Sequence, residues 1–140
     1  MFKILYCSMF RNIICSGFII AGGTPVTSSV EVFNPLTGHS CPVDDLPQKR
    51  RSGQICNNMI CGGDGTSASD RSCEMFDGAS SFTRLSVTLV EQRRFHLCWG
   101  LQSGEVILLG GSVSRSIRTT ERVSADGSSS SSDFSLPDDT

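Results

Sequence analysis

The chain has 140 residues, of which 38% are hydrophobic, and a formal charge of −2 from 12 basic and 14 acidic side chains. This length suits one domain, and the charge balance excludes a polybasic surface for nucleic acid or for an anionic membrane. Fourteen glycines and a charged content of only 19% favour short strands joined by turns over amphipathic helices, so we expect an all-β fold.

The N-terminal region is apolar between Met1 and Ala21, but Arg11 and Asn12 interrupt it, so it does not predict a membrane-spanning helix. Lys3 followed by the apolar residues 13–21 is also the pattern of a signal peptide. The alternative is that residues 11–23 form two strands of a first repeat. We prefer the repeat, because cleavage near Ala21 would leave the next strand, around Glu31, unpaired.

Three apolar segments in the chain end in a pair of glycines, and the first glycines of these pairs lie 40 and then 48 residues apart. The pairs are Gly22 and Gly23, Gly62 and Gly63, and Gly110 and Gly111. Each is followed by a glutamate that begins a second apolar segment: Glu31, Glu74 and Glu121. Short apolar segments bounded by glycine or polar residues are typical of β-strands.

An arginine also recurs before the glycine pairs, at Arg11, Arg51 and Arg93. Cys56 and Cys98 each follow such an arginine by five residues. The interval from Arg93 to Gly110 is about six residues longer than the one from Arg51 to Gly62, which we assign to a longer turn near Gly100.

This pattern resembles the kelch repeat, whose units of about 50 residues each form one four-stranded antiparallel blade of a β-propeller. The resemblance covers residues 11–125 as two nearly complete blades and the start of a third. It places residues 1–10 as an N-terminal extension. A propeller closes with four to eight blades, so a chain of this length is expected to form a partial propeller, a fragment of a longer protein, with open faces available for self-association.

The segment 126–140 is rich in serine and aspartate and has no basic residue. Such a composition cannot bury itself, and it predicts a disordered tail or loop.

The repeated residues have structural and functional interpretations. We expect the six glycines to serve turns and the three glutamates to be scaffold positions, because one residue per repeat is usually architectural. In kelch propellers the repeated arginine faces the central channel and sometimes contacts an acidic peptide. The candidate ligand contacts are therefore Arg11, Arg51 and Arg93, together with Arg115 and Arg118 of a later loop; the structural alternative for the repeated arginines is an ion pair with a carboxylate.

Seven cysteines are an odd number without metal-site spacing, and neither His39 nor His96 lies at a zinc-motif distance from another ligand. We therefore predict no metal and no cofactor. If the protein is oxidised, the preferred disulfide is Cys61–Cys73 across a hairpin, with Cys41–Cys56 and Cys41–Cys61 as alternatives. The cysteine content favours secretion, whereas the lack of an expected signal peptide and of glycosylation sequons opposes it, so the compartment is left open between cytoplasmic and secreted.

No catalytic motif is recognised, and the first functional hypothesis is a non-enzymatic module that binds a protein or peptide through blade loops. These loops are residues 24–29, 64–72 and 112–119. The alternative is a secreted, disulfide-stabilised remnant of a kelch or galactose-oxidase-like ectodomain that binds carbohydrate or an extracellular protein.

Overall fold

The computed structural model describes residues 5–6, 17–65, 71–135 and 137, and it consists of three four-stranded antiparallel sheets. The first sheet contains β1 (Leu5–Tyr6), β2 (Phe18–Ala21), β3 (Val30–Asn34) and β4 (His39–Pro42). The second contains β5 (Gln54–Cys56), β6 (Met59–Cys61), β7 (Ser72–Phe76) and β8 (Phe82–Thr88). The third contains β9 (Leu97–Gly100), β10 (Val106–Leu109), β11 (Thr119–Val123) and β12 (Ser130–Ser135).

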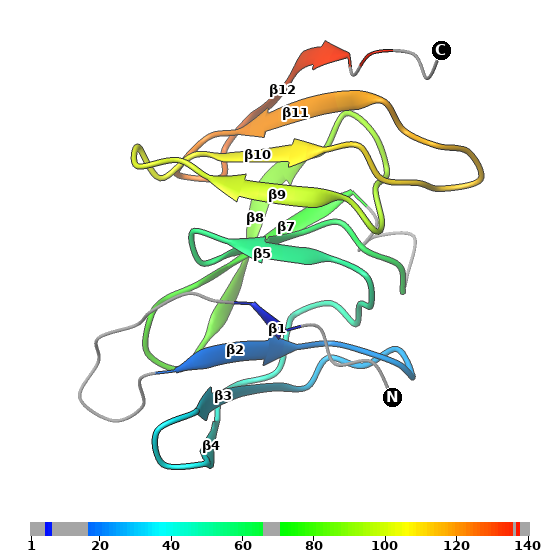
Figure 1. The fold of residues 1–140 in the computed structure, drawn as a ribbon. Helices are drawn as coiled ribbons and strands as arrows, with labels where there is room; N and C mark the ends of the chain where they lie inside the picture. Colours follow the sequence, from blue (N-terminus) through cyan, green and yellow to red (C-terminus); the bar gives the residue numbers. More distant parts are fainter. Residues whose placement is uncertain (1–4, 7–16, 66–70, 136, 138–140) are drawn as a thin grey trace.

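Within each sheet, strands that follow one another in the chain are neighbours, so each sheet is a simple up-and-down meander. Figure 1 shows the sheets one above the other, from the blue β2 to the red β12, without closure into a ring. The prediction of an all-β, antiparallel fold is confirmed. The described residues contain no helix that is long and apolar enough to cross a membrane.

The hydrophobic core lies in two layers between the sheets, because alternate side chains of each strand point to opposite faces. The first layer joins the first two sheets through Ile19, Ala21, Val30, Val32, Ile55, Ile60, Phe76 and Phe82. The second joins the last two sheets through Met59, Cys61, Cys73, Val87, Val106, Leu108 and Val123. In β2, β3 and β10 the buried positions alternate with half-buried ones, whereas β6 is buried throughout because its two faces contribute to the two layers.

The six repeated glycines all have positive φ, as the sequence suggests for turn positions. The constraint is strongest at Gly63, whose φ is +105° and whose missing Cβ would lie 2.6 Å from the carbonyl oxygen of Arg51. Gly111 repeats this arrangement in the third sheet, with φ +105° and the carbonyl oxygen of Arg94 at 2.8 Å. These glycines allow the chain that leaves β6 or β10 to pass close to the segment that leads into the first strand of the same sheet.

Both ends of the repeated region differ from the sequence prediction. The first strand is Leu5–Tyr6, which pairs with Ile20 and Ile19, so it lies inside the segment assigned to an N-terminal extension. At the other end, Ser130–Ser135 pairs with β11 as an edge strand, so the prediction of a disordered tail is wrong for these residues. An edge strand is held by backbone hydrogen bonds, and polar serines facing solvent do not prevent it. The Thr120 hydroxyl contributes by donating to the carbonyl of Phe134 at 3.0 Å.

Candidate functional site

Two arginines among the residues that the structure describes, Arg50 and Arg93, are buried, and they occupy equivalent positions in the second and third sheets. Arg50 donates from Nη1 to the carbonyl of Gly62 at 2.7 Å, and Arg93 donates from Nη1 to the carbonyl of Gly110 at 3.0 Å. The repeated glutamates neutralise them: Glu74 lies 2.8 Å from Arg50, and Glu121 lies 3.2 Å from Arg93. The repeated arginine and glutamate therefore stabilise the second and third sheets from within.

This equivalence corrects the register that we took from the sequence. The residue of the second sheet that is equivalent to Arg93 is Arg50 and not Arg51. Arg93 is only 1% exposed, so the prediction of Arg93 as a ligand contact is wrong. The error arises because both sites are Arg-Arg doublets and the turns that follow them differ in length. Arg11 lies outside the described residues.

The second arginine of each doublet faces the surface, and both bind one carboxylate. Arg51 donates from Nε and Nη2 to Asp64 Oδ2 at 3.1 and 2.9 Å, and Arg94 donates from Nη1 to the same oxygen at 3.2 Å. The hydrogen bond from Arg51 lowers the pKa of Asp64 below its usual value, and Arg94 acts in the same direction. Asp64 therefore stays ionised at neutral pH, and the three side chains together carry a net positive charge.

These three residues line a cleft of about 620 Å³ at the loop end of the sheets. The lining comes from all three sheets and consists of Gly23, Thr24, Arg51, Ser52, Asp64, Arg94 and Phe95. Ser52 and Phe95 follow the paired arginines, both have positive φ (57° and 54°), and the Phe95 amide donates to the Ser52 carbonyl at 3.0 Å. The Phe95 ring is 68% exposed, so the cleft combines cationic side chains with an aromatic surface.

Of the three predicted loops, the first contributes Thr24 and the second contributes Asp64 to this cleft. The third lies against it, because Arg94 donates from Nη2 to the carbonyl of Val113 at 2.7 Å. The other predicted arginines lie outside the lining. Arg115 is 80% exposed with its Nη2 3.9 Å from Glu91, and Arg118 donates to the carbonyl of Pro137. The sequence analysis missed Arg94 and Phe95, although the repeated Arg-Arg doublets were a signal that could have revealed them.

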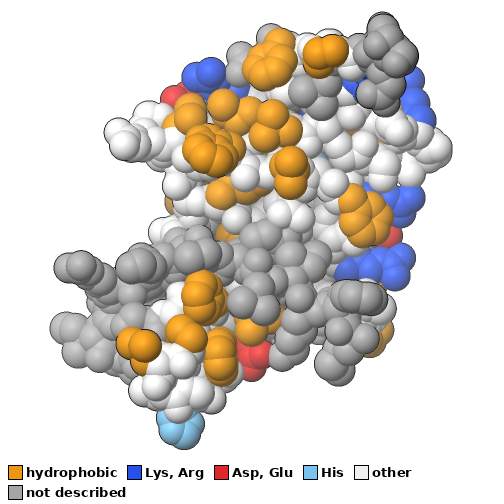
Figure 2. Space-filling model, in the orientation of Figure 1, with side chains coloured by type: hydrophobic (Ala, Val, Ile, Leu, Met, Phe, Trp, Pro, Cys, Tyr) orange, Lys and Arg blue, Asp and Glu red, His pale blue; other side chains and the backbone are white. Residues whose placement is uncertain are grey.

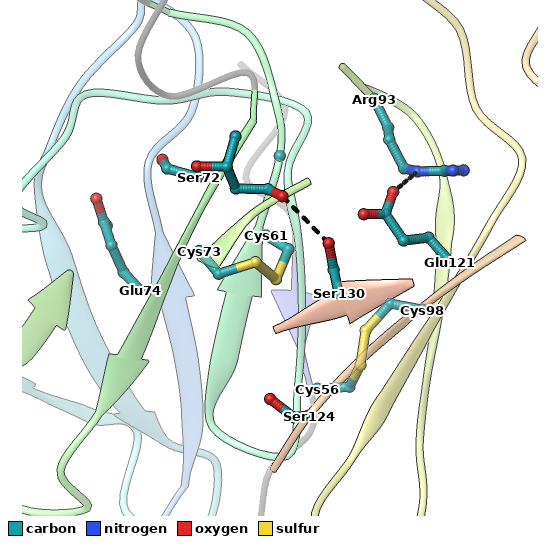
Figure 3. The surroundings of a disulfide bond; sticks show 12 residues. Cys56, Cys61, Ser72, Cys73, Glu74, Arg93, Cys98, Glu121, Ser124 and Ser130 are labelled. Atoms are coloured by element: carbon teal, nitrogen blue, oxygen red, sulfur yellow. Dashed lines mark hydrogen bonds and ion pairs between the residues drawn. A yellow bond between two sulfur atoms is a disulfide. The ribbon is translucent and has the colours of Figure 1, made fainter. Parts of the chain in front are cut away.

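The cysteines form disulfides in the described structure (Figure 3). The predicted Cys61–Cys73 bond is present and joins neighbouring strands of the second sheet, with Cα atoms 4.1 Å apart. Cys56 is bonded to Cys98, so the alternative pairings of Cys41 with Cys56 or with Cys61 are wrong. Cys41 is disulfide-bonded as well.

The Cys56–Cys98 bond is the covalent link between the second and third sheets. The two residues are not equivalent in the repeat: Cys56 pairs with Met59 and Cys98 with Leu108, one register position apart. The difference is required, because side chains that meet between two sheets must point to opposite faces of their own sheets. Beside this bond, the Asn57 side chain donates to the carbonyls of Leu101 and Glu105 at 2.7 and 3.0 Å, which fixes one sheet against the next.

Chemically, the cleft is equipped to bind a carboxylate and an adjoining apolar group, because arginine forms directed hydrogen bonds with carboxylates. Within the part of the chain that the structure describes, no group of three or more metal-binding side chains was found. The search of protein families matched no family model, and no curated protein was significantly similar to the chain.

Proposed function

We propose that this chain is a non-enzymatic protein-interaction module of the kelch type, and that it binds an acidic segment of a partner protein in the cleft between Arg51, Asp64 and Arg94. The support for a kelch-type module is the succession of three four-stranded meanders with glycine pairs at equivalent positions, and the equivalent arginine–glutamate pairs of the second and third. The loops that follow β2 and β6 and the segments that precede β5 and β9 meet at one end of the sheets, where the cleft lies.

The observation that carries the proposal is the sharing of one carboxylate oxygen by two arginines. Asp64 neutralises only one of the two positive charges, and Arg51 remains 42% exposed at the surface. A glutamate or aspartate of a partner would supply the missing negative charge, and the cleft would shield the new pair partly from water. Figure 2 shows basic side chains together with an exposed hydrophobic one at the right-hand edge of the molecule.

A peptide-display selection on the immobilised chain tests this proposal. We expect the enriched peptides to contain an aspartate or glutamate next to an apolar residue. We also expect Arg94→Ala to weaken binding of a synthetic enriched peptide by at least tenfold. Arg115→Ala is the matched control, since Arg115 is an exposed arginine outside the cleft, and it should leave the affinity within a factor of two. Enriched peptides without acidic residues, or equal effects of the two variants, would refute the proposal.

The disulfides favour an extracellular setting for the module, which is the second functional candidate. All five cysteines in the part of the chain that the structure describes are disulfide-bonded, and such bonds persist in oxidising compartments. We therefore expect no more than two free thiols in denatured protein purified without reductant from a secretory host. Five or more free thiols in that material would favour the intracellular alternative.

A further inference from the structure

The third sheet presents an apolar face that no other sheet covers. This outer face is made by alternate residues of β9 and β10: Leu97, Trp99, Ile107 and Leu109. Leu97 is 70% exposed and Trp99 is 65% exposed. Figure 2 shows hydrophobic side chains gathered on the upper part of the molecule, where Figure 1 places these strands.

The residues of the outer face occupy repeat positions that are covered in the other two sheets. Ile107 and Leu109 correspond to Met59 and Cys61 of the second sheet, since each pair leads directly into the repeated glycines. Met59 and Cys61 are buried against the third sheet. In the first sheet the same positions are Ile19 and Ala21, which are buried against the second sheet.

The opposite face of the first sheet has the matching character. Phe18, Ile20 and Phe33 lie on it and are half-buried. Counted from the glycine pairs, Phe18 and Ile20 correspond to Val106 and Leu108 of the third sheet, and Phe33 corresponds to Val123. Val106, Leu108 and Val123 are the residues that the third sheet packs against the second. The chain therefore carries both halves of its own internal sheet-to-sheet interface, one on each terminal sheet.

Charge does not oppose such a contact, because the two faces carry side chains of opposite sign: Glu31 pairs with Ile20 on the first sheet, and Arg122 pairs with Ile107 on the third. Arg122 also lies 3.8 Å from the Glu105 carboxylate. The outer face is thus apolar with a locally compensated charge at its border, as is usual for the centre and rim of a protein interface.

We propose that the outer face of the third sheet binds the Phe18, Ile20 and Phe33 face of a second copy of this chain. The contact is head-to-tail, because it joins two different faces, and it continues the internal packing of the sheets across two molecules. A head-to-tail contact closes into a ring if its rotation allows and otherwise extends into a filament. Two copies with three sheets each would close a ring of six sheets, which lies within the range of closed propellers.

Trp99 is the only tryptophan of the chain, so it reports directly on this interface. We expect light scattering between 1 and 100 µM protein to show a mass above that of one chain, together with a blue shift of tryptophan emission over the same concentrations. Trp99→Lys should raise the dissociation constant at least tenfold. Leu36→Lys is the matched control, because Leu36 is 94% exposed at the β3–β4 turn and belongs to neither face.

The head-to-tail arrangement has a further test in mixing. Trp99→Lys blocks one face and Ile20→Lys blocks the other, so each variant alone should remain monomeric, whereas an equal mixture should form a dimer through the one intact pair of faces. Circular dichroism checks that the variants fold, and Phe33→Lys replaces Ile20→Lys if the latter does not. A monomeric wild-type chain at 100 µM, or association of Trp99→Lys equal to that of the wild type, would overturn the proposal. This test is independent of the cleft.

Discussion

Arg50 and Glu74 form an ion pair in which Nη2 and Oε1 are 2.8 Å apart and both side chains are excluded from solvent. Burial raises the pKa of Glu74, and the charge of Arg50 opposes that effect. Arg93 and Glu121 repeat the arrangement in the next sheet, where the Glu121 carboxylate also accepts the Val90 amide at 2.6 Å. The second and third sheets thus each hold a buried arginine paired with a repeated glutamate, and Arg93 also has the Glu91 carboxylate at 3.6 Å.

Removal of the Glu74 carboxylate should destabilise the folded state. We expect Glu74→Ala to lower the free energy of unfolding by about 3–5 kcal/mol, because it leaves the Arg50 guanidinium buried without its counter-charge. Urea unfolding followed by circular dichroism measures the change. The double variant Arg50→Met with Glu74→Leu should recover much of the loss, since no charge then remains buried. A loss below about 1 kcal/mol in Glu74→Ala would contradict the buried pair.

The inter-sheet disulfide should stabilise the protein more than the one within the second sheet. Cys56–Cys98 spans 42 residues and Cys61–Cys73 spans 12. In the chain-entropy model these separations correspond to about 4 and about 3 kcal/mol. Urea unfolding of the paired Cys→Ser variants gives both values. We expect the variant without Cys56–Cys98 to have the lower midpoint, and the reverse order would argue against that bond as the main covalent link between sheets.

Acid should destabilise the fold through His96. Burial, with a smaller contribution from the nearby Arg93 charge, lowers the pKa of His96 to about 3. The unfolded chain binds a proton at this residue below pH 6.5 and the folded chain does not, so stability falls as the pH decreases from about 6.5 towards 3. At pH 4.5 the loss is about 3 kcal/mol relative to neutral pH.

The measurement that isolates this effect is urea unfolding of wild type and His96→Gln at several pH values. Glutamine cannot take up the proton, so the difference between the two proteins should change by that amount between pH 7 and pH 4.5. Other titrating groups contribute equally to both proteins and cancel. Parallel stability profiles would show that His96 does not titrate as the burial requires.

Comparison of two glycines separates the cost of a steric clash from the cost of a left-handed backbone conformation. Gly63 and Gly38 both have positive φ, but a Cβ at Gly63 would collide with the Arg51 backbone, whereas no atom lies within 4 Å of one at Gly38. We expect Gly38→Ala to cost about 1 kcal/mol from the left-handed conformation alone. Gly63→Ala should cost at least about 2 kcal/mol more, as its backbone must also shift. Thermal unfolding of the two variants decides this, and equal costs would exclude the close approach.

The sequence predicts the repeated elements of this fold well because each repeat contains local signals. The glycine pairs and the glutamates that follow them are separated by short, similar intervals, so their register is correct. The arginine register is wrong because it must be counted across turns of different length. Leu5–Tyr6 and Ser130–Ser135 were missed as strands, since edge strands need only backbone pairing and carry little hydrophobic pattern.

The candidate site depends on contacts that local pattern cannot supply. Asp64 accepts a hydrogen bond from Arg94, which lies 30 residues later in the sequence, and this contact requires the third sheet to pack against the second. The sequence identified Arg51 and the three loops but could not show that a second arginine shares its carboxylate. The Cys61–Cys73 bond was predictable because a hairpin sets its geometry, whereas Cys56–Cys98 depends on the packing of two sheets.

The cleft draws its two cationic groups from different sheets, Arg51 from the second and Arg94 from the third. The spacing of its hydrogen-bond donors is therefore a property of the docking between sheets and not of any one loop. Any change that loosens this docking, including reduction of Cys56–Cys98, would alter the affinity for the proposed acidic ligand without changing a residue of the cleft. Reducing conditions would then change binding at the cleft through a bond that lies outside it.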